Sequence, residues 1–305
     1  KDFRQLHSKT PGHPEYGITD GVETTTGPLG QGLANAIGMA IAEKILASKI
    51  NTEKIKPVDH RTYCFVGDGC LMEGISHEVM SLAGVLELNK LICFYDSNGI
   101  SIDGEIKDWY KDDIKLRCES YGWNVIGEID GHNRDEINQA IVAAKESNKP
   151  TMIVCKTSIG YGAGSKQDSE SSHGAPLGEE VLAELRKNLD WEYKSFEIPE
   201  SVYADWDFKE KGKNLEENWK AICADHAKND PEKATLLKRL VSGDLPENFM
   251  EAFDNHIEVL KENNDSIATR KCSQMILEFL KEQLPELIGG SADLSGSNNT
   301  ITKAS

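Results

Sequence analysis

Hydrophobic residues in the first half of the chain fall into short continuous runs that alternate with helix-periodic segments. The runs have the length of buried β-strands and lie at 62–66, 91–95, 124–129 and 151–155. Helical periodicity lies between or before them, at about 25–47, 73–88 and 133–147. Short apolar strands that alternate with helices predict a mostly parallel sheet covered on both faces, which is a doubly wound α/β domain.

The second half of the chain has a different pattern. Residues 157–177 are rich in Gly and Ser, and so long a connection is either disordered or a functional lid. A polar, helix-favouring stretch follows, and near Ser266 a new helix and then a strand-like segment at 287–294 suggest a second α/β domain. We therefore predict three parts: an α/β domain over 1–190, a helical linker over 191–265 and the start of a second α/β domain over 266–305.

The composition narrows the classes of partner. The 305 residues include 51 Asp and Glu against 34 Lys and Arg, which gives a net charge of -17. This excess of negative charge argues against binding to nucleic acid phosphates or to anionic membranes. The seven cysteines are scattered without a Cys-x-x-Cys motif, which favours reduced thiols and a cytoplasmic location. We also find no apolar run long enough for a membrane span.

The stretch CFVGDGCLMEG (64–74) carries the candidate chemistry. An apolar strand ends in Asp68 with a glycine on each side, and the next strand ends close to Asn98. Ligands of doubly wound sheets gather at the carboxyl ends of the strands. A carboxylate, an amide oxygen and a nearby backbone carbonyl suit a hard cation such as Mg²⁺. Taken alone, Gly-Asp-Gly is more often a tight turn, but the strand before it, the helix after it and Asn98 favour the metal site.

Gly-Asp-Gly followed about thirty residues later by Asn resembles the thiamine diphosphate signature. The resemblance extends to the transketolase family through blocks that run in family order over nearly the whole chain. These blocks are HSKTPGHPE (7–15), GVETTTGPLGQGLANAIGMAIAEK (21–44), GDGCLMEGISHE (67–78), DSNGISIDG (96–104), DGHN (130–133), SHGAPLG (172–178) and GGSADLSGSN (289–298).

The resemblance implies a cofactor site at the sheet edge. Asp68, Asn98 and the carbonyl of Ile100 would hold Mg²⁺ (or Ca²⁺ or Mn²⁺), and Asn98 would also contact thiamine diphosphate. Gly69 would contact the diphosphate through its backbone, and the turn Gly27-Pro28-Leu29 would lie against the cofactor ring. This turn is also a plausible helix entry with close packing, and both interpretations can hold together.

The resemblance also assigns roles to residues that are otherwise unremarkable. His13 and His173 lie in Pro/Gly or Ser/Gly loops, where most histidines are solvated surface residues. In the family, both would lie beside the cofactor and sugar and move protons, and His173 would bind cofactor and substrate. Arg270 and Ser297 would bind the phosphate end of the substrate, although an exposed charge at a helix start would account for Arg270 equally.

Quaternary structure is implied in the same way. Glu73 and Glu78 could be a solvated helix face, but the family places equivalent glutamates at a homodimer interface that links two active sites. We interpret His60 and His77 as structural.

The activity implied is transfer of a two-carbon ketol unit from a ketose phosphate, such as xylulose 5-phosphate, to ribose 5-phosphate or erythrose 4-phosphate in the pentose phosphate pathway. Dihydroxyacetone synthase or 1-deoxyxylulose 5-phosphate synthase would share the metal signature, and a noncatalytic binding module could keep the fold. Both ends resemble cuts through a longer protein. The chain would then comprise most of the first domain and the start of a second, pyrimidine-binding domain. The family glutamate that activates the cofactor would lie downstream, so we expect residues 1–305 alone to be inactive.

Overall fold

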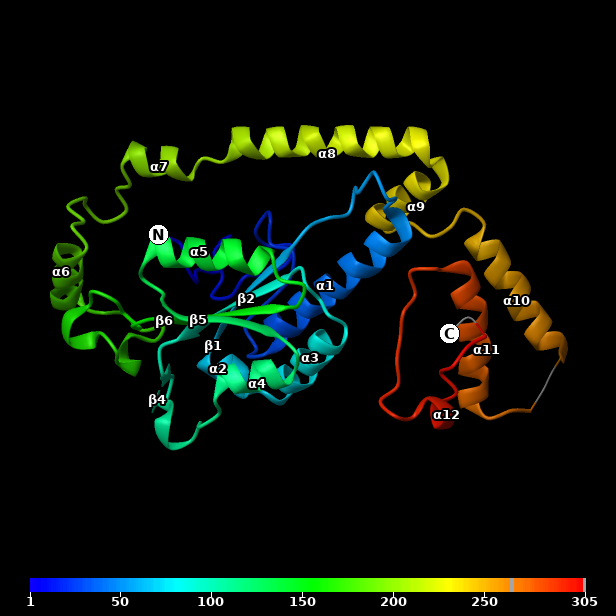
Figure 1. Cartoon of the computed structure of the whole chain (residues 1–305), viewed down its shortest axis with the longest axis horizontal. Helices are drawn as coiled ribbons and strands as arrows, with labels where there is room; N and C mark the ends of the chain where they lie inside the picture. The colour runs from blue at the N-terminus through cyan, green and yellow to red at the C-terminus, as the bar shows by residue number, and fades with distance from the viewer. Residues whose placement is uncertain (264–265, 304–305) are drawn as a thin grey trace. The chain divides into compact units, whose positions relative to one another are not determined.

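The computed structural model describes residues 1–263 and 266–303, which contacts divide into two compact units (Figure 1). The first unit comprises Lys1–Asn51 and Lys56–Trp219. The second comprises Thr52–Ile55 and the described residues from Lys220 onward. This division differs from the three parts expected from the sequence. Its boundary between Trp219 and Lys220 falls within α8 (Lys209–Asn229), which is one continuous helix.

A four-stranded parallel sheet forms the centre of the first unit. Its strand order is β1-β2-β6-β5. The strands are β1 (Thr62–Gly67), β2 (Leu91–Ser97), β5 (Asn124–Asp130) and β6 (Thr151–Lys156). All neighbouring strands are parallel, so the four predicted strands and the predicted parallel α/β fold are confirmed. The carboxyl ends of these strands share one edge of the sheet.

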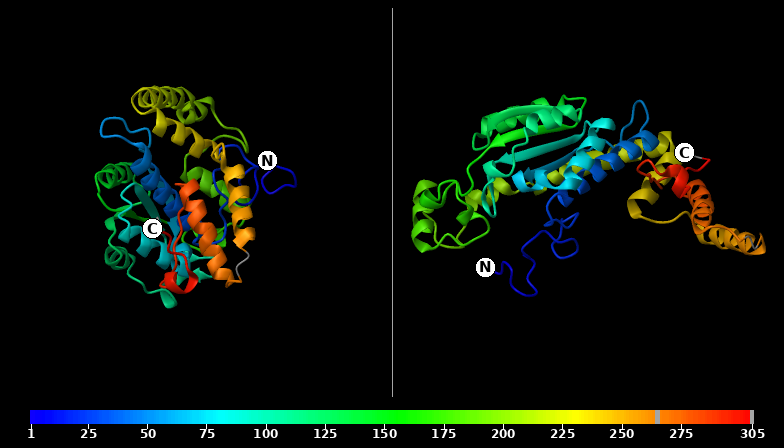
Figure 2. Two further views of the ribbon diagram at one scale, coloured as in Figure 1. Left: turned by 90° about the vertical axis from the view of Figure 1, so that its right-hand side faces the viewer. Right: turned by 90° about the horizontal axis from the view of Figure 1, so that it is seen from below.

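Helices cover both faces of this sheet, as the alternating pattern predicted. One core joins the sheet to α1 (Gln31–Ile50), α3 (Gly74–Val85) and α4 (Ile114–Ser120). The other joins it to α5 (Arg134–Lys145) through Ala140 and Ala144. Figure 2 shows α5 on one side of the strands and α1 on the other. Burial on both faces accounts for the continuous apolar runs of β2 and β6.

The helical pattern predicted from residue 25 begins later, at Gln31, because a glycine turn precedes it. Gly30 adopts φ 78, a left-handed conformation that favours glycine. A methyl group on Gly30 would lie 2.8 Å from Ile75 Cγ2 and 3.0 Å from Glu73 Cβ. The glycine therefore lets the start of α1 pack closely against the start of α3.

Short elements complete the first unit. Beside the sheet edge these are α2 (Asp68–Met72), β3 (Ile100–Ser101), β4 (Gly104–Glu105) and the 3-10 turn η1 (Ile106–Asp108). The predicted long connection after β6 contains only two 3-10 turns, η2 (Gly164–Lys166) and η3 (Glu170–Ser172). The helices α6 (Glu179–Asn188) and α7 (Glu200–Trp206) follow it.

The second unit is helical in its described residues. Its helices are α9 (Pro231–Ser242), α10 (Phe249–Asn263), α11 (Thr269–Gln283) and α12 (Ser295–Asn298). The helix predicted after Ser266 is confirmed as α11, but the strand expected in 287–294 is wrong, since residues 266–303 contain none. A strand needs a neighbour for its backbone hydrogen bonds, and the described part of this unit contains no strand with which 287–294 could pair. Within residues 1–263 and 266–303, no helix combines the length and hydropathy that crossing a bilayer requires.

Candidate active site at the carboxyl edge of the sheet

Asp68 lies at the carboxyl edge of the sheet, where β1 ends and α2 begins. The apolar strand carries the chain to this edge, and Gly67 then turns it into the short helix in an extended conformation, with φ -102 and ψ -179. Only 2% of Asp68 is exposed. The carboxylate therefore lies inside the protein at the edge where ligands of such sheets bind.

Two hydrogen bonds hold this carboxylate. Tyr95 in β2 donates its hydroxyl to Asp68 Oδ1, and the backbone amide of Gly99 donates to Asp68 Oδ2 at 3.0 Å. Burial raises the pKa of the Asp68 carboxyl, and the bonds from Tyr95 and Gly99 act in the opposite direction. Burial, together with the bond to Asp68, also raises the pKa of Tyr95. The hydroxyl therefore stays protonated and remains a donor to the carboxylate at neutral pH.

Asn98 and Ile100 flank Gly99, so the turn that contains them lies against Asp68. Asn98 Oδ1 accepts a hydrogen bond from the amide of Ile100 at 2.9 Å, and Asn98 Nδ2 donates to Asp96 Oδ1 at 3.3 Å. The parallel register pairs Gly67 with Asp96, which brings the ends of β1 and β2 together. The structure thus brings Asp68 and the turn 98–100 together.

Oxygen atoms dominate the donor set at this edge. A carboxylate has about four acceptor positions, and Asp68 uses two of them for Tyr95 and Gly99. In the described ranges, no three His, Cys, Asp or Glu side chains cluster as metal ligands. A cation site here would therefore use one carboxylate with neutral amide and carbonyl oxygens, a set that suits Mg²⁺.

The glycine turn before α1 lies against α2. A methyl group on Gly69 would lie 3.2 Å from Leu29 Cδ1, and one on Gly27 would lie 2.9 Å from His13 Cγ. Gly27 also adopts φ 144, a value that strongly favours glycine. These contacts bring four of the expected site residues together: Gly27, Leu29, Gly69 and His13. Pro28 lies within the same turn and is exposed.

The remaining expected residues belong to other segments of the chain. His173 follows η3 and is exposed, and its backbone amide donates to the carbonyl of Glu170 at 2.9 Å. Neither His13 nor His173 forms a side-chain hydrogen bond with another described residue. Arg270, in the first turn of α11, and Ser297, in α12, are exposed residues of the second unit.

The glutamates and the two histidines interpreted as structural also have defined places. Glu73 separates α2 from α3 and Glu78 lies within α3, and both are exposed. His77 is half-buried and contacts the hydroxyl of Tyr121 at 3.1 Å, whereas His60 is exposed.

Sequence patterns missed one residue that contacts Asp68 and one that contacts α2. Tyr95 reads as one more apolar position of its strand, although its parallel register with Val66 places it two residues from Asp68 across the sheet. Arg117 reads as a surface charge on α4, but only 9% of its side chain is exposed. A tyrosine near the end of the neighbouring strand was the available signal for the first, and no local pattern indicates the second.

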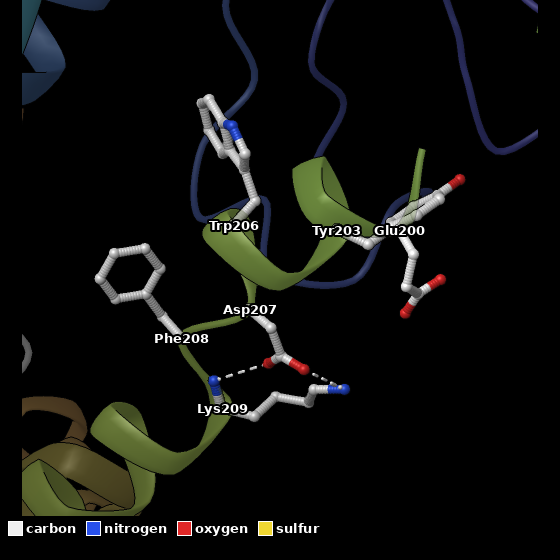
Figure 3. A pocket seen from close by; sticks show the side chains of 6 residues that line it. All are labelled: Glu200, Tyr203, Trp206, Asp207, Phe208 and Lys209. Atoms are coloured by element: carbon white, nitrogen blue, oxygen red, sulfur yellow. Dashed lines mark hydrogen bonds and ion pairs between the residues drawn. The ribbon is translucent and has the colours of Figure 1, made fainter. Parts of the chain in front are cut away.

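A hollow of 270 Å³ adjoins this edge. It is lined by Tyr95, Ser97, Asp112, Asp113, Ile114, Lys115, Gly127, Glu128 and Val154. A second recess, of 760 Å³, lies on α7 and the start of α8 and presents Tyr203, Trp206 and Phe208 (Figure 3). Asp207 and Lys209 pair with each other there at 2.9 Å. This recess contains none of the expected site residues.

Comparisons with known proteins agree with the fold. The family described as "Transketolase, thiamine diphosphate binding domain" matches residues 1–246. The chain is 54% identical over 306 residues to Transketolase 1 of Pasteurella multocida (strain Pm70) and likewise to Transketolase 2 of Escherichia coli (strain K12). Each alignment covers 100% of this chain and 46% of the relative, so the chain spans about half the length of these relatives.

Solved structures give the same result. Transketolase from Leishmania mexicana superposes with a TM-score of 0.90 at 40% identity, over 99% of this chain and 45% of that one. A Pichia stipitis transketolase in complex with sedoheptulose 7-phosphate superposes equally well, with 39% identity over 99% of this chain and 44% of that one. From the family match, the identity of the relatives and the shared fold, we conclude that this chain belongs to the transketolase family.

Proposed function

We propose that this chain forms the metal- and diphosphate-binding part of a transketolase. The reaction is transfer of a two-carbon ketol unit from a ketose phosphate, such as xylulose 5-phosphate, to ribose 5-phosphate or erythrose 4-phosphate in the pentose phosphate pathway. The observation that carries the proposal is the buried carboxylate of Asp68, held at the sheet edge against the turn 98–100. Dihydroxyacetone synthase and 1-deoxyxylulose 5-phosphate synthase would share this feature, and the names of the relatives favour transketolase.

The residues at this edge fit a divalent cation. In the proposal, Asp68, Asn98 and the carbonyl of Ile100 hold Mg²⁺, or Ca²⁺ or Mn²⁺ in its place. The buried charge of Asp68 supports this role, because burial raises the pKa of the carboxyl and a cation would offset the cost of burying its charge. Magnesium binds few protein ligands and completes its shell with phosphate oxygens and water.

The same edge fits a bound diphosphate. Gly69 lacks a side chain beside Leu29, so a phosphate group can approach its backbone. The turn Gly27-Pro28-Leu29 would lie against the ring of the cofactor, and Asn98 would contact the diphosphate as well as the metal. When bound, thiamine diphosphate supplies the reactive carbon and the electron sink for breaking a carbon–carbon bond.

The other site residues act on the sugar in this proposal. His13 packs against Gly27 in the cofactor turn, a position from which its imidazole would exchange protons with substrate hydroxyls. His173 would do the same from its exposed loop and would also contact the cofactor. Arg270 would bind the substrate phosphate through charge-assisted hydrogen bonds, and Ser297 would donate its hydroxyl to the same group.

We also propose a homodimer, with Glu73 and Glu78 at the interface, and a cytoplasmic location. Exposure of both glutamates supports the first, and seven cysteines without a disulfide support the second. The domain order proposed for the chain remains 1–190, 191–265 and 266–305. Because the relatives are about twice as long, we expect residues 1–305 alone to lack ketol-transfer activity, which an assay with xylulose 5-phosphate and ribose 5-phosphate would test.

Calorimetric titration with thiamine diphosphate, with Mg²⁺ or with EDTA, tests the proposed cofactor site. The native-length protein should bind the cofactor in Mg²⁺ and lose affinity in EDTA. Asp68→Asn should remove this metal dependence while circular dichroism stays unchanged. Asp103→Asn is the matched control, since Asp103 is an exposed carboxylate in the β3–β4 turn. Metal-independent binding by the wild type, or full metal dependence in Asp68→Asn, would contradict the proposal.

A further inference from the structure

The short helix α2 ends in a way that leaves backbone carbonyls without helical partners. It has only five residues, and at Glu73 the backbone leaves the helix with φ -66 and ψ 140. The last carbonyls of a helix need hydrogen-bond donors from outside the helix. For Cys70 that partner is the hydroxyl of Ser76 in α3, which donates to the carbonyl at 2.5 Å.

The carbonyl of Leu71 receives its partners from a different element. Arg117 in α4 donates from Nη2 to this oxygen at 3.0 Å, and the hydroxyl of Tyr110 lies 3.4 Å away. Leu71 is fully buried and the Arg117 side chain is 9% exposed. Water is therefore largely excluded from this contact, and an unpaired carbonyl there would destabilise the fold.

The guanidinium of Arg117 is itself held in place. Nη1 donates to His77 Nε2 at 3.2 Å and to Asp112 Oδ2 at 3.0 Å. Because arginine has no acceptor atom, His77 Nε2 must accept, so a neutral His77 carries its proton on Nδ1 and donates it to the Tyr121 hydroxyl at 3.1 Å. The side chains of His77 and Asp112, together with the backbone carbonyl of Leu71, thus hold the guanidinium in place against α2.

This arrangement has a cost that simple packing does not explain. Arg117 Nε is buried and has no hydrogen-bond partner among the described residues. A buried donor left unpaired destabilises the fold, and apolar side chains often replace buried charges without loss of stability. The buried guanidinium nevertheless donates a hydrogen bond to Leu71, which lies in the same helix as Asp68 and Gly69.

We propose that Arg117 is a positioning residue, which holds α2 so that Asp68 and Gly69 stay in register for the cation and the diphosphate. The inference rests on the proposed function, because it assigns the purpose of the α2 position to that site. Arg117 does not contact the site itself and acts through the carbonyl of Leu71. His77 and Asp112 orient its guanidinium.

Mn²⁺ binding in the presence of thiamine diphosphate, followed by electron paramagnetic resonance on the native-length protein, tests this role without measuring activity. Removing groups that orient metal ligands commonly weakens metal affinity by about tenfold or more. We expect Arg117→Met to lose at least this much and Arg117→Lys, which keeps a donor, to recover part of it. Hydrogen exchange of the α2 amides should be faster than in the wild type in both variants, and faster in Arg117→Met than in Arg117→Lys.

Trp123→Phe is the matched control. It removes the buried hydrogen bond of 2.8 Å that Trp123 Nε1 donates to the carbonyl of Met80. This bond lies in the same core, but its acceptor is in α3 and not in α2. The Mn²⁺ affinity of this variant should stay at the wild-type value. Equal losses in Arg117→Met and Trp123→Phe, or an unchanged affinity in a folded Arg117→Met, would overturn the inference. If Arg117→Met does not fold, Arg117→Lys decides by the same comparison. Absence of Mn²⁺ binding in the wild type would instead refute the proposed function.

Discussion

The hydroxyl of Tyr95 donates a hydrogen bond to Asp68 Oδ1, and this bond joins the ends of two neighbouring parallel strands. Tyr95 is 5% exposed and Asp68 2%. The bond therefore lies where water does not replace it easily. Its strength depends on the charge of the acceptor, because hydrogen bonds to ionised groups exceed those between neutral groups.

Tyr95→Phe should destabilise the first unit by about 1–3 kcal/mol, because it leaves a buried charged acceptor with one partner fewer. Urea unfolding followed by the fluorescence of buried Trp123 would measure this change. Tyr63→Phe is the control: Tyr63 lies on β1 with 44% exposure, and loss of its hydroxyl should leave the midpoint unchanged. Equal midpoints for Tyr95→Phe and the wild type would contradict the importance of the bond.

Two glycines within helices should respond to alanine with opposite signs. A methyl group on Gly84 in α3 would lie 1.7 Å from the carbonyl oxygen of Tyr121, which is backbone and cannot rotate away. Around Gly38 in α1, nothing lies within 4 Å of the added carbon. Alanine is normally better than glycine in a helix by about 0.8–1.0 kcal/mol. Gly38→Ala should therefore stabilise the protein, whereas Gly84→Ala must separate α3 from the 121–123 segment.

Thermal unfolding distinguishes the two variants. We expect a higher transition temperature for Gly38→Ala. For Gly84→Ala we expect a loss of about 1–3 kcal/mol or more, the cost of overpacking a core. A stabilised Gly84→Ala would show that α3 and the segment at Tyr121 do not pack as closely as the structure indicates.

Lys90 joins the buried carboxylate of Glu43 at 2.5 Å to Asp59 at 2.7 Å. Removing one partner of a buried pair leaves the other charge uncompensated, so Lys90→Met should cost about 3 kcal/mol in the free energy of unfolding. Adding Glu43→Leu should recover most of this loss, because the double variant leaves no unpaired buried charge. A double variant as unstable as Lys90→Met would contradict this account.

The same cluster predicts a dependence of stability on pH. Partial burial by itself would lower the pKa of Lys90, but hydrogen bonds to Asp59 and Glu43 raise it above its ordinary value of 10.5. The folded protein thus holds this proton more tightly than the unfolded chain does. The contribution is fully present below pH 10.5 and is lost as the pH rises through the folded pKa. The wild type should accordingly lose more stability than Lys90→Met over this alkaline range.

Periodicity alone was sufficient for the sheet and for the place of Asp68. Buried parallel strands leave continuous apolar runs, and the end of such a run locates the ligand-binding edge. Asp68 and the turn that contains Asn98 do meet at that edge, through the amide of Gly99. These features depend on residues close in sequence to a strand end, which is why a one-dimensional pattern contains them.

Features that depend on distant partners were not predictable in the same way. The position of Arg117 under α2 arises from the packing of α4 against α2 and α3, and nothing in the residues around Arg117 indicates it. The segment 287–294 has the apolar composition of a strand, yet a strand also needs a neighbour to pair with. The described residues of the second unit provide none, so composition alone gave the wrong prediction.

Gly69→Ala separates the needs of the fold from those of the proposed cofactor site. The new methyl group would lie 3.2 Å from Leu29 Cδ1, the end of a side chain that is 52% exposed and can move by a few tenths of an ångström. Alanine also favours the helical conformation of α2. The stability of the protein should therefore change little.

Cofactor affinity should change much more. In the proposed site the diphosphate approaches the backbone of Gly69. The methyl group of Gly69→Ala would push against Leu29 and would also obstruct the diphosphate. Loss of one charge-assisted hydrogen bond, worth about 1.5–3 kcal/mol, weakens binding by about tenfold or more. Gly74→Ala is the control, since nothing lies within 4 Å of a methyl group there. Calorimetry in Mg²⁺ should show normal thiamine diphosphate affinity for Gly74→Ala and a weaker one for Gly69→Ala, and equal affinities would place the diphosphate away from Gly69.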